Sequence, residues 1–195
     1  MNSLITYLET SFANNRSSKR TDVLNSVLLE KFLDENPQWG HLTYKFEVPL
    51  PDAYGATFKV DCVGFDDDNN PIVVLLNKNA NSNFAQNLKN YANTTVGEAA
   101  RILLGECGET LKQVYFITVH PNHAPFFKSG GKVGRIEDVS RAKKRTNIVP
   151  VIKTLYPNKV TLVTVTFDIN EVREFTHKEQ FCEGVTVSNL ATVYE

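Results

Sequence analysis

The sequence predicts an α/β domain in which helices cover both faces of a mixed β-sheet. Apolar and polar residues alternate over residues 41–50 and 58–65, as in strands with one buried face. Residues 72–77 are apolar on both faces, as in a strand at the centre of a covered sheet. Over residues 83–104 the apolar positions change to helical spacing, which predicts a helix that packs on this sheet.

The N-terminal elements follow from periodicity and from helix-breaking residues. Residues 3–12 form a short amphipathic helix, and a polar, basic break follows at residues 14–20. Thr21 or Asp22 can cap a second helix that runs to about Asp34 and ends before Asn36-Pro37, because proline disfavours helical backbone in the residue before it.

The second half of the chain adds further elements. We expect strands over residues 114–119 and 159–167, a helix over 147–156, a helix-like segment over 170–180 and a last extended piece. Residues 128–146 are rich in glycine and charge, which predicts a mobile loop. The order is helix, three-strand meander, helix and strand, followed by a C-terminal extension.

Composition is that of one soluble domain spanning residues 1–195. The chain is 42% hydrophobic and 22% charged, as in globular proteins, and its apolar runs are too short to cross a membrane. Cys62, Cys107 and Cys182 are odd in number and widely spaced. We therefore expect no disulfide and a cytoplasmic location.

Positive charge is concentrated in one stretch. Residues 128–145 carry two acidic and seven basic residues, namely Lys128, Lys132, Arg135, Arg141, Lys143, Lys144 and Arg145. The stretch has a net charge of +5, which leaves −6 for the remainder of a chain whose net charge is −1. Such a run suits an anionic partner, although a solvated loop without a partner explains it equally well.

Three ionisable residues stand out in the predicted elements. Asp61 lies in the middle of a strand, where aspartate is disfavoured. Lys78 ends the next strand of the meander. Glu30 lies among the apolar positions of the second helix, where an unpaired carboxylate is costly to bury. These residues are the candidates for a catalytic site.

This order of elements, with these residues, resembles the PD-(D/E)xK nuclease superfamily and more loosely its RecB-like exonuclease branch. The pattern of that superfamily is a restriction-endonuclease-like core with a Glu on the first helix, an Asp on the second strand and acid-x-Lys on the third. Glu30, Asp61 and Lys78 occupy these places, and the resemblance covers residues 22–119. The Gln-x-x-x-Tyr often found on the next helix is matched by Asn87 and Tyr91, which implies that this pair supports Lys78 and contacts a nucleic-acid backbone.

Leu76 departs from the pattern, because it occupies the acid position of acid-x-Lys. In several members of the superfamily the missing acid comes from the next helix. Glu98 shares a helix face with Asn87 and Tyr91, so it is the candidate replacement. The resemblance then implies that Asp61, Glu98 and Glu30 hold Mg²⁺ or Mn²⁺.

The expected function is Mg²⁺-dependent hydrolysis of DNA phosphodiester bonds. Lys78 would assist the attacking water, and the basic residues of 128–145 would contact the phosphate backbone. The alternative, which Leu76 favours, is a catalytically inactive module of the same fold that binds nucleic acid or a protein partner.

Overall fold

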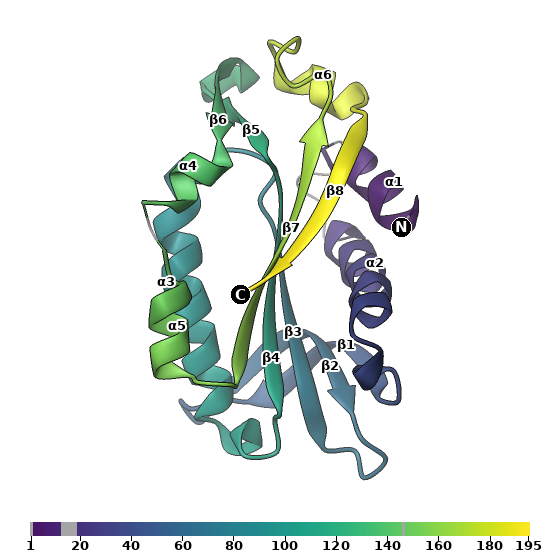
Figure 1. Cartoon of the computed structure of the whole chain (residues 1–195), viewed down its shortest axis with the longest axis vertical. Helices are drawn as coiled ribbons and strands as arrows, with labels where there is room; N and C mark the ends of the chain where they lie inside the picture. Colours follow the sequence, from purple (N-terminus) through teal and green to yellow (C-terminus); the bar gives the residue numbers. More distant parts are fainter. Residues whose placement is uncertain (1, 13–18, 146) are drawn as a thin grey trace.

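The computed structural model describes residues 2–12, 19–145 and 147–195. Its centre is a six-stranded sheet in the order β1-β2-β3-β4-β7-β8 (Figure 1). β1, β2 and β3 form an antiparallel meander, β3, β4 and β7 run parallel, and β8 returns antiparallel to β7. The prediction of a mixed sheet is confirmed. The strand bounds are Thr43–Pro51, Thr57–Phe65, Pro71–Asn79, Gln113–Pro121, Val160–Ile169 and Val187–Tyr194.

Helices lie on both faces of this sheet, as predicted. α1 (Asn2–Ser11) and α2 (Lys19–Glu35) cover one face, and α3 (Phe84–Leu103), α4 (Val139–Lys143) and α5 (Val149–Leu155) lie on the other (Figure 1). Short 3₁₀ turns occur at Pro37–Trp39, Glu106–Gly108 and Ser129–Gly131. Within the described ranges, no helix combines the length and the apolar character that a membrane crossing requires. The three cysteines are free thiols.

β3 shows why the sheet is covered twice. Val73 and Leu75 are buried in the core cluster that includes the residues of α1 and α2. Val74 and Leu76 are buried in the cluster on the opposite face, which includes residues of α3 and α5. The predicted burial of this strand on both faces is confirmed. The same alternation directs the side chains that follow Leu76 to opposite faces of the sheet.

The stretch expected to be a loop contains regular structure. Within residues 128–146, β6 (Val133–Asp138) pairs antiparallel with β5 (His123–Phe127), which lies just before this stretch, and α4 follows at once. Ala124, Val139 and Ala142 are buried against Phe84 of α3. Glycine and charge content predicted the loop, but three small apolar residues at suitable spacing are enough to dock the hairpin and α4 on α3.

Two other boundaries differ from expectation. Residues 14–18 of the predicted break lie outside the described residues, and α2 begins at Lys19, so Thr21 and Asp22 lie inside the helix. The helix-like segment expected at 170–180 is a series of turns followed by α6 (Lys178–Glu183). The Gln180 side chain accepts hydrogen bonds from the backbone N–H groups of Thr176 and His177. This capping box fixes the start of α6.

Glu137 of β6 caps α3. Its carboxylate is buried, accepts a hydrogen bond from the backbone N–H of Ala85 at 3.0 Å and pairs with Arg135 at 2.7 Å. The N-cap residue of α3, Asn83, makes no side-chain capping bond of its own. A carboxylate from a different element therefore satisfies the first turn of this helix.

We expect Glu137→Ala to lower the free energy of unfolding by about 1–2 kcal/mol, because it removes a helix cap and leaves the partly buried N–H of Ala85 without this partner. Urea denaturation measures the change. Glu109→Ala is the matched control, because Glu109 is exposed, and a shift within about 0.5 kcal/mol is expected. Equal stability of the two variants would contradict the capping role.

Candidate active site

Asp61 lies where β2 and β3 separate. The backbone pairing of these strands runs from Phe65 to Cys62 and from Pro71 to Leu75 and goes no further, although both strands continue. The Asp61 Oδ2 atom accepts a hydrogen bond from the backbone N–H of Asn77 at 2.7 Å. The carboxylate thus takes the place of a backbone acceptor at the point where the β2–β3 pairing ends. We call this point the opening.

Lys78 and Glu98 form an ion pair beside this opening. Strand alternation places Lys78 on the α3 face of β3, and its Nζ lies 3.3 Å from both carboxylate oxygens of Glu98. The two side chains are 25% and 20% exposed. Glu98 therefore faces the site rather than solvent, as its predicted helix face requires.

The charges around Asp61 are mostly negative. Burial raises the pKa of Asp61 above its usual value, against the opposing effect of the Asn77 N–H bond. The charges of Glu47 and Glu98 raise this pKa further, and that of Lys78 lowers it. A partly buried carboxylate with two acidic neighbours and one ammonium is an environment that a bound cation would relieve.

Glu47 of β1 is a site residue that sequence reasoning missed. Phe46 pairs with Cys62 and Val48 with Val60, so Glu47 lies opposite Asp61. Its backbone has a φ of +55°, a conformation that non-glycine residues seldom adopt and that is often found at functional sites. Its carboxylate pairs with Lys59 at 2.5 Å. The alternation of apolar and polar residues along β1 does not predict this positive φ at Glu47.

Asn25 of α2 is the second missed residue. It is fully buried, its amide nitrogen donates to the Asp61 backbone oxygen at 3.4 Å, and its amide oxygen accepts from the Asn77 side chain at 2.9 Å. Asn25 thus fixes both strands at the opening from the α2 side. An asparagine inside the apolar stripe of a helix needs buried hydrogen-bond partners. Its position in that stripe could therefore have identified Asn25 from the sequence.

Glu30 is placed at the contact of α2 with α1. Its carboxylate accepts a hydrogen bond from the Ser3 hydroxyl at 2.7 Å. Glu30 lies five positions after Asn25, which turns it about 140° around the helix from the residue that faces Asp61. In the described part of the chain, no three acidic, histidine or cysteine side chains gather as a metal-binding group. The predicted set of Asp61, Glu98 and Glu30 is therefore not assembled.

Asn87 and Tyr91, the pair expected to support Lys78, make contacts within α3 and its N-cap. The Asn87 side chain donates to the backbone oxygen of Asn83 at 3.1 Å, and the Tyr91 ring packs on Phe84 with 5.9 Å between centroids. Tyr91 also lines a cavity beside α3. Among the described residues, Glu98 is the side chain that holds the Lys78 ammonium.

Leu76 occupies the position of the second strand acid. It is 5% exposed and packs in the α3-side core. Its neighbour Asn77 points to the other face and bonds Asn25, as alternation predicted. No carboxylate from β3 thus reaches the site.

The seven basic residues of 128–145 have different surroundings. Arg135 and Arg141 pair with Glu137 and Asp138 at 2.7 and 3.4 Å. Lys143 turns inward and donates to the Thr164 hydroxyl at 2.8 Å. The remaining four are exposed: Lys128, Lys132, Lys144 and Arg145. The Arg135 and Arg141 side chains are also 58% and 83% exposed, so six of the seven residues could meet a nucleic acid.

The donors at the opening fit a divalent cation in charge and in kind. Mg²⁺ is commonly held by one or two carboxylates and keeps several waters, and Asp61 and Glu98 supply two. Occupancy would require Glu98 to share its carboxylate between the cation and Lys78. Comparison with protein-family models, with curated proteins and with solved structures finds no match to this chain.

Proposed function

We propose that the protein is a metal-dependent nuclease that hydrolyses DNA phosphodiester bonds at the opening between β2 and β3. The proposal is carried by one observation: the Lys78 ammonium is held by Glu98 next to Asp61, whose pKa is raised by burial and by acidic neighbours. An ammonium that stabilises developing charge, beside a carboxylate that can hold a cation, is a pair suited to phosphodiester hydrolysis.

Each residue has a defined role in this proposal. Asp61 and Glu98 would hold Mg²⁺ or Mn²⁺, which supplies Lewis-acid polarisation of the phosphate when bound. Lys78 orients the attacking water and stabilises negative charge that develops on the phosphate oxygens. Glu98 also positions the Lys78 side chain. The exposed Lys128, Lys132, Lys144 and Arg145 would contact the DNA backbone, with an affinity that falls as salt rises.

The fold order supports this proposal. α2, the β1–β3 meander, α3 and β4 follow one another in the sequence expected of a restriction-endonuclease-like core, with Asp61 on the second strand and Lys78 on the third. The Lys78 and Glu98 side chains are 25% and 20% exposed, so a phosphate could approach this pair from solvent.

A second candidate function is a module of the same fold that binds nucleic acid or a protein without cutting. Leu76 favours it, because a buried leucine replaces the acid expected two residues before Lys78. The position of Glu30 leaves one fewer carboxylate for the expected metal site, and the inward position of Lys143 leaves one fewer of the expected nucleic-acid contacts.

Cleavage assays separate the two candidates. Linear, circular and single-stranded DNA are incubated with the protein and Mg²⁺ or Mn²⁺, with a chelator as the blank. We expect Lys78→Ala to reduce cleavage by about 100-fold or more, because it removes the group that stabilises developing charge.

The matched control is Lys31→Ala. Lys31 forms a comparable Lys–Glu pair with Glu35 at 2.6 Å on α2, so its loss should leave cleavage unchanged. Equal cleavage by wild type and Lys78→Ala would show that the activity lies elsewhere. DNA binding without cleavage of any substrate would favour the second candidate.

A further inference from the structure

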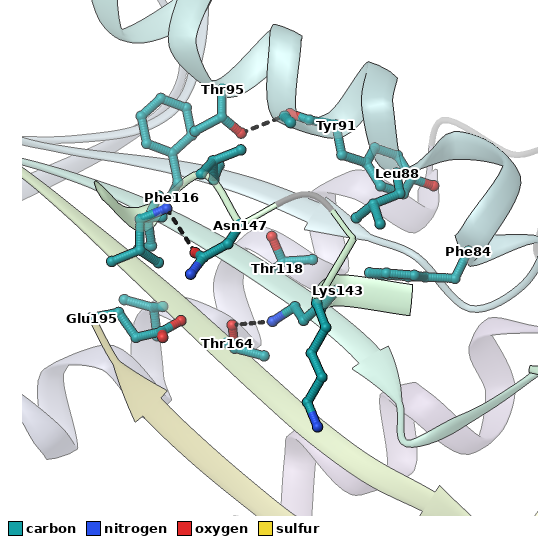
Figure 2. A pocket seen from close by; sticks show the side chains of 16 residues that line it. Phe84, Leu88, Tyr91, Thr95, Phe116, Thr118, Lys143, Asn147, Thr164 and Glu195 are labelled. Carbon is teal, nitrogen blue, oxygen red and sulfur yellow. Dashed lines mark hydrogen bonds between the residues drawn. The ribbon is translucent and has the colours of Figure 1, made fainter. Parts of the chain in front are cut away.

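A cavity of about 340 Å³ lies between α3 and the sheet, beyond the Lys78–Glu98 pair. One wall is apolar and aromatic, formed by Phe84, Leu88 and Tyr91 of α3 together with Phe116 of β4. Figure 2 shows the Lys143, Thr118 and Thr164 side chains within the same space. Volume and lining match ligand sites in proteins, which are mostly apolar with a few polar groups.

The polar end of the cavity is built by neighbouring strands. Lys78 pairs in register with Thr118 on β4, and Thr118 pairs with Thr164 on β7. The hydroxyls of Thr118 and Thr164 therefore form a row on the α3 face of the sheet, next to the candidate active site. Thr164 accepts the hydrogen bond from Lys143 (Figure 2).

Lys143 is the unusual group in this cavity. Burial lowers the pKa of its ammonium, and the charge of Glu195 opposes this shift. Within the described residues its one hydrogen-bond partner is the neutral Thr164 hydroxyl. A partly buried ammonium without a carboxylate in contact is unfavourable, and an anion in the cavity would supply the missing charge.

His120 does not add positive charge at this end. Its ring packs on Phe84 with 5.0 Å between centroids, and its Nδ1 lies 3.0 Å from the backbone oxygen of Pro121. Burial, and next the charge of Lys143, lower the pKa of His120 to about 4. The imidazole is therefore neutral at physiological pH. Lys144 also lines the cavity but is exposed to solvent, so Lys143 supplies the partly buried charge that an anion would meet.

We propose that this cavity binds a small organic anion with an aromatic body, its carboxylate or phosphate group on Lys143 and its ring against Phe84, Leu88 and Tyr91. Glu195 also lines the cavity, on the other side of Thr164 from Lys143 in Figure 2. The anionic group therefore lies on the Lys143 side, and the apolar wall holds the ring. This site does not depend on nuclease activity.

Calorimetric titration with ligand pairs that differ in charge tests the proposal. Indole-3-acetate is compared with indole-3-acetamide, and adenosine monophosphate with adenosine. We expect the anion of at least one pair to bind about tenfold more tightly than its neutral partner, because a charge-assisted bond to Lys143 is lost in the latter. Preference confined to one pair identifies the head group as a carboxylate or as a phosphate.

Three variants define the site. Lys143→Met should reduce the anion preference to near unity, and Glu195→Gln should tighten anion binding. Lys153→Met, a change of an exposed lysine on α5, should leave binding unchanged. Absence of binding at millimolar concentration, equal binding of anions and neutral partners, or weaker anion binding to Glu195→Gln would overturn the proposal. Glu195→Gln keeps the test decisive if Lys143→Met fails to fold.

Discussion

Asp61→Asn is expected to abolish metal-dependent cleavage while leaving the folded protein at least as stable as wild type at neutral pH. Asparagine has nearly the same shape, and its carbonyl oxygen can accept the hydrogen bond that Asp61 accepts from the Asn77 N–H. It lacks the negative charge that the proposed cation needs. Cleavage should fall by about 100-fold or more, as when a group that stabilises charge in the transition state is removed.

The expected gain in stability follows from the direction of the pKa shift. Burial, with Glu47 and Glu98, raises the pKa of Asp61, so the folded state holds a proton that the unfolded chain has already released. Stability therefore falls as pH rises from the unfolded pKa, about 3.9, through the folded pKa, and stays lower above it. Asparagine has no charge in this pH range, so the Asp61→Asn variant does not lose this stability. Urea denaturation should show Asp61→Asn gaining on wild type as pH rises above the unfolded pKa, with the full gain present above the folded pKa.

Asp66→Asn is the control, and its expected change in stability has the opposite sign. Backbone hydrogen bonding from Asn70 in the β2–β3 turn lowers the pKa of Asp66. Its ionised form therefore stabilises the fold above the unfolded pKa, and this contribution disappears as pH falls through the folded pKa. Asp66→Asn should lose stability at neutral pH and keep full cleavage. Retained cleavage in Asp61→Asn would refute the proposed function, and a loss of stability would refute the electrostatic account.

Local patterns in the sequence were sufficient for the central strands and for the side chains at their ends. The unbroken apolar run of residues 72–76 predicted burial on both faces, and Val73 to Leu76 are buried. Period-two alternation then predicted that Asn77 and Lys78 point to opposite faces, which their bonds to Asn25 and Glu98 confirm. Helical spacing likewise placed Glu98 on the face that meets Lys78.

Contacts between distant elements could not be read in this way. Asn25 meets Asp61 and Asn77 only because α2 crosses the sheet at the opening. Glu47 comes close to Asp61 through a left-handed backbone conformation inside β1. No residue type in the strand predicts this conformation. The apolar neighbours of Glu30 in the sequence suggested a buried site residue, but its carboxylate bonds the Ser3 hydroxyl on α1. Such pairings depend on tertiary packing and not on periodicity.

Within the C-terminal extension, the expected helix over 147–156, the strand over 159–167 and the last extended piece are confirmed as α5, β7 and β8. The packing of α6 could not be predicted, because its aromatic contacts include elements far away in the sequence. Phe181 of α6 is fully buried. Its ring centroid lies 5.6 Å from that of Phe12, 5.4 Å from that of Phe127 and 4.9 Å from that of Phe175. The adjacent Cys182 thiol donates to the backbone oxygen of Phe12 at 3.2 Å. One aromatic cluster thus joins α1, the β5–β6 hairpin and the extension.

Phe181→Ala is therefore expected to destabilise the whole domain by about 3–5 kcal/mol, the usual loss for a buried phenylalanine. That is a large part of the total stability of about 5–15 kcal/mol typical of a domain. Phe46→Ala is the control, because Phe46 on β1 is 42% exposed and should cost less than about 1 kcal/mol. Urea unfolding is followed by circular dichroism and by the fluorescence of Trp39, which lies far from the cluster in the sequence and donates to the Tyr115 hydroxyl.

Both probes should report one transition, shifted to lower urea in Phe181→Ala, because the extension shares a core cluster with α1, α2 and the central strands. Two separate transitions, with the Trp39 signal unchanged, would mean that the extension unfolds independently of the β1–β4 region. In that case residues 147–195 would be an accessory to the core and not part of its cooperative unit. A single shifted transition would show that the extension helps to hold together the sheet that carries Asp61 and Lys78.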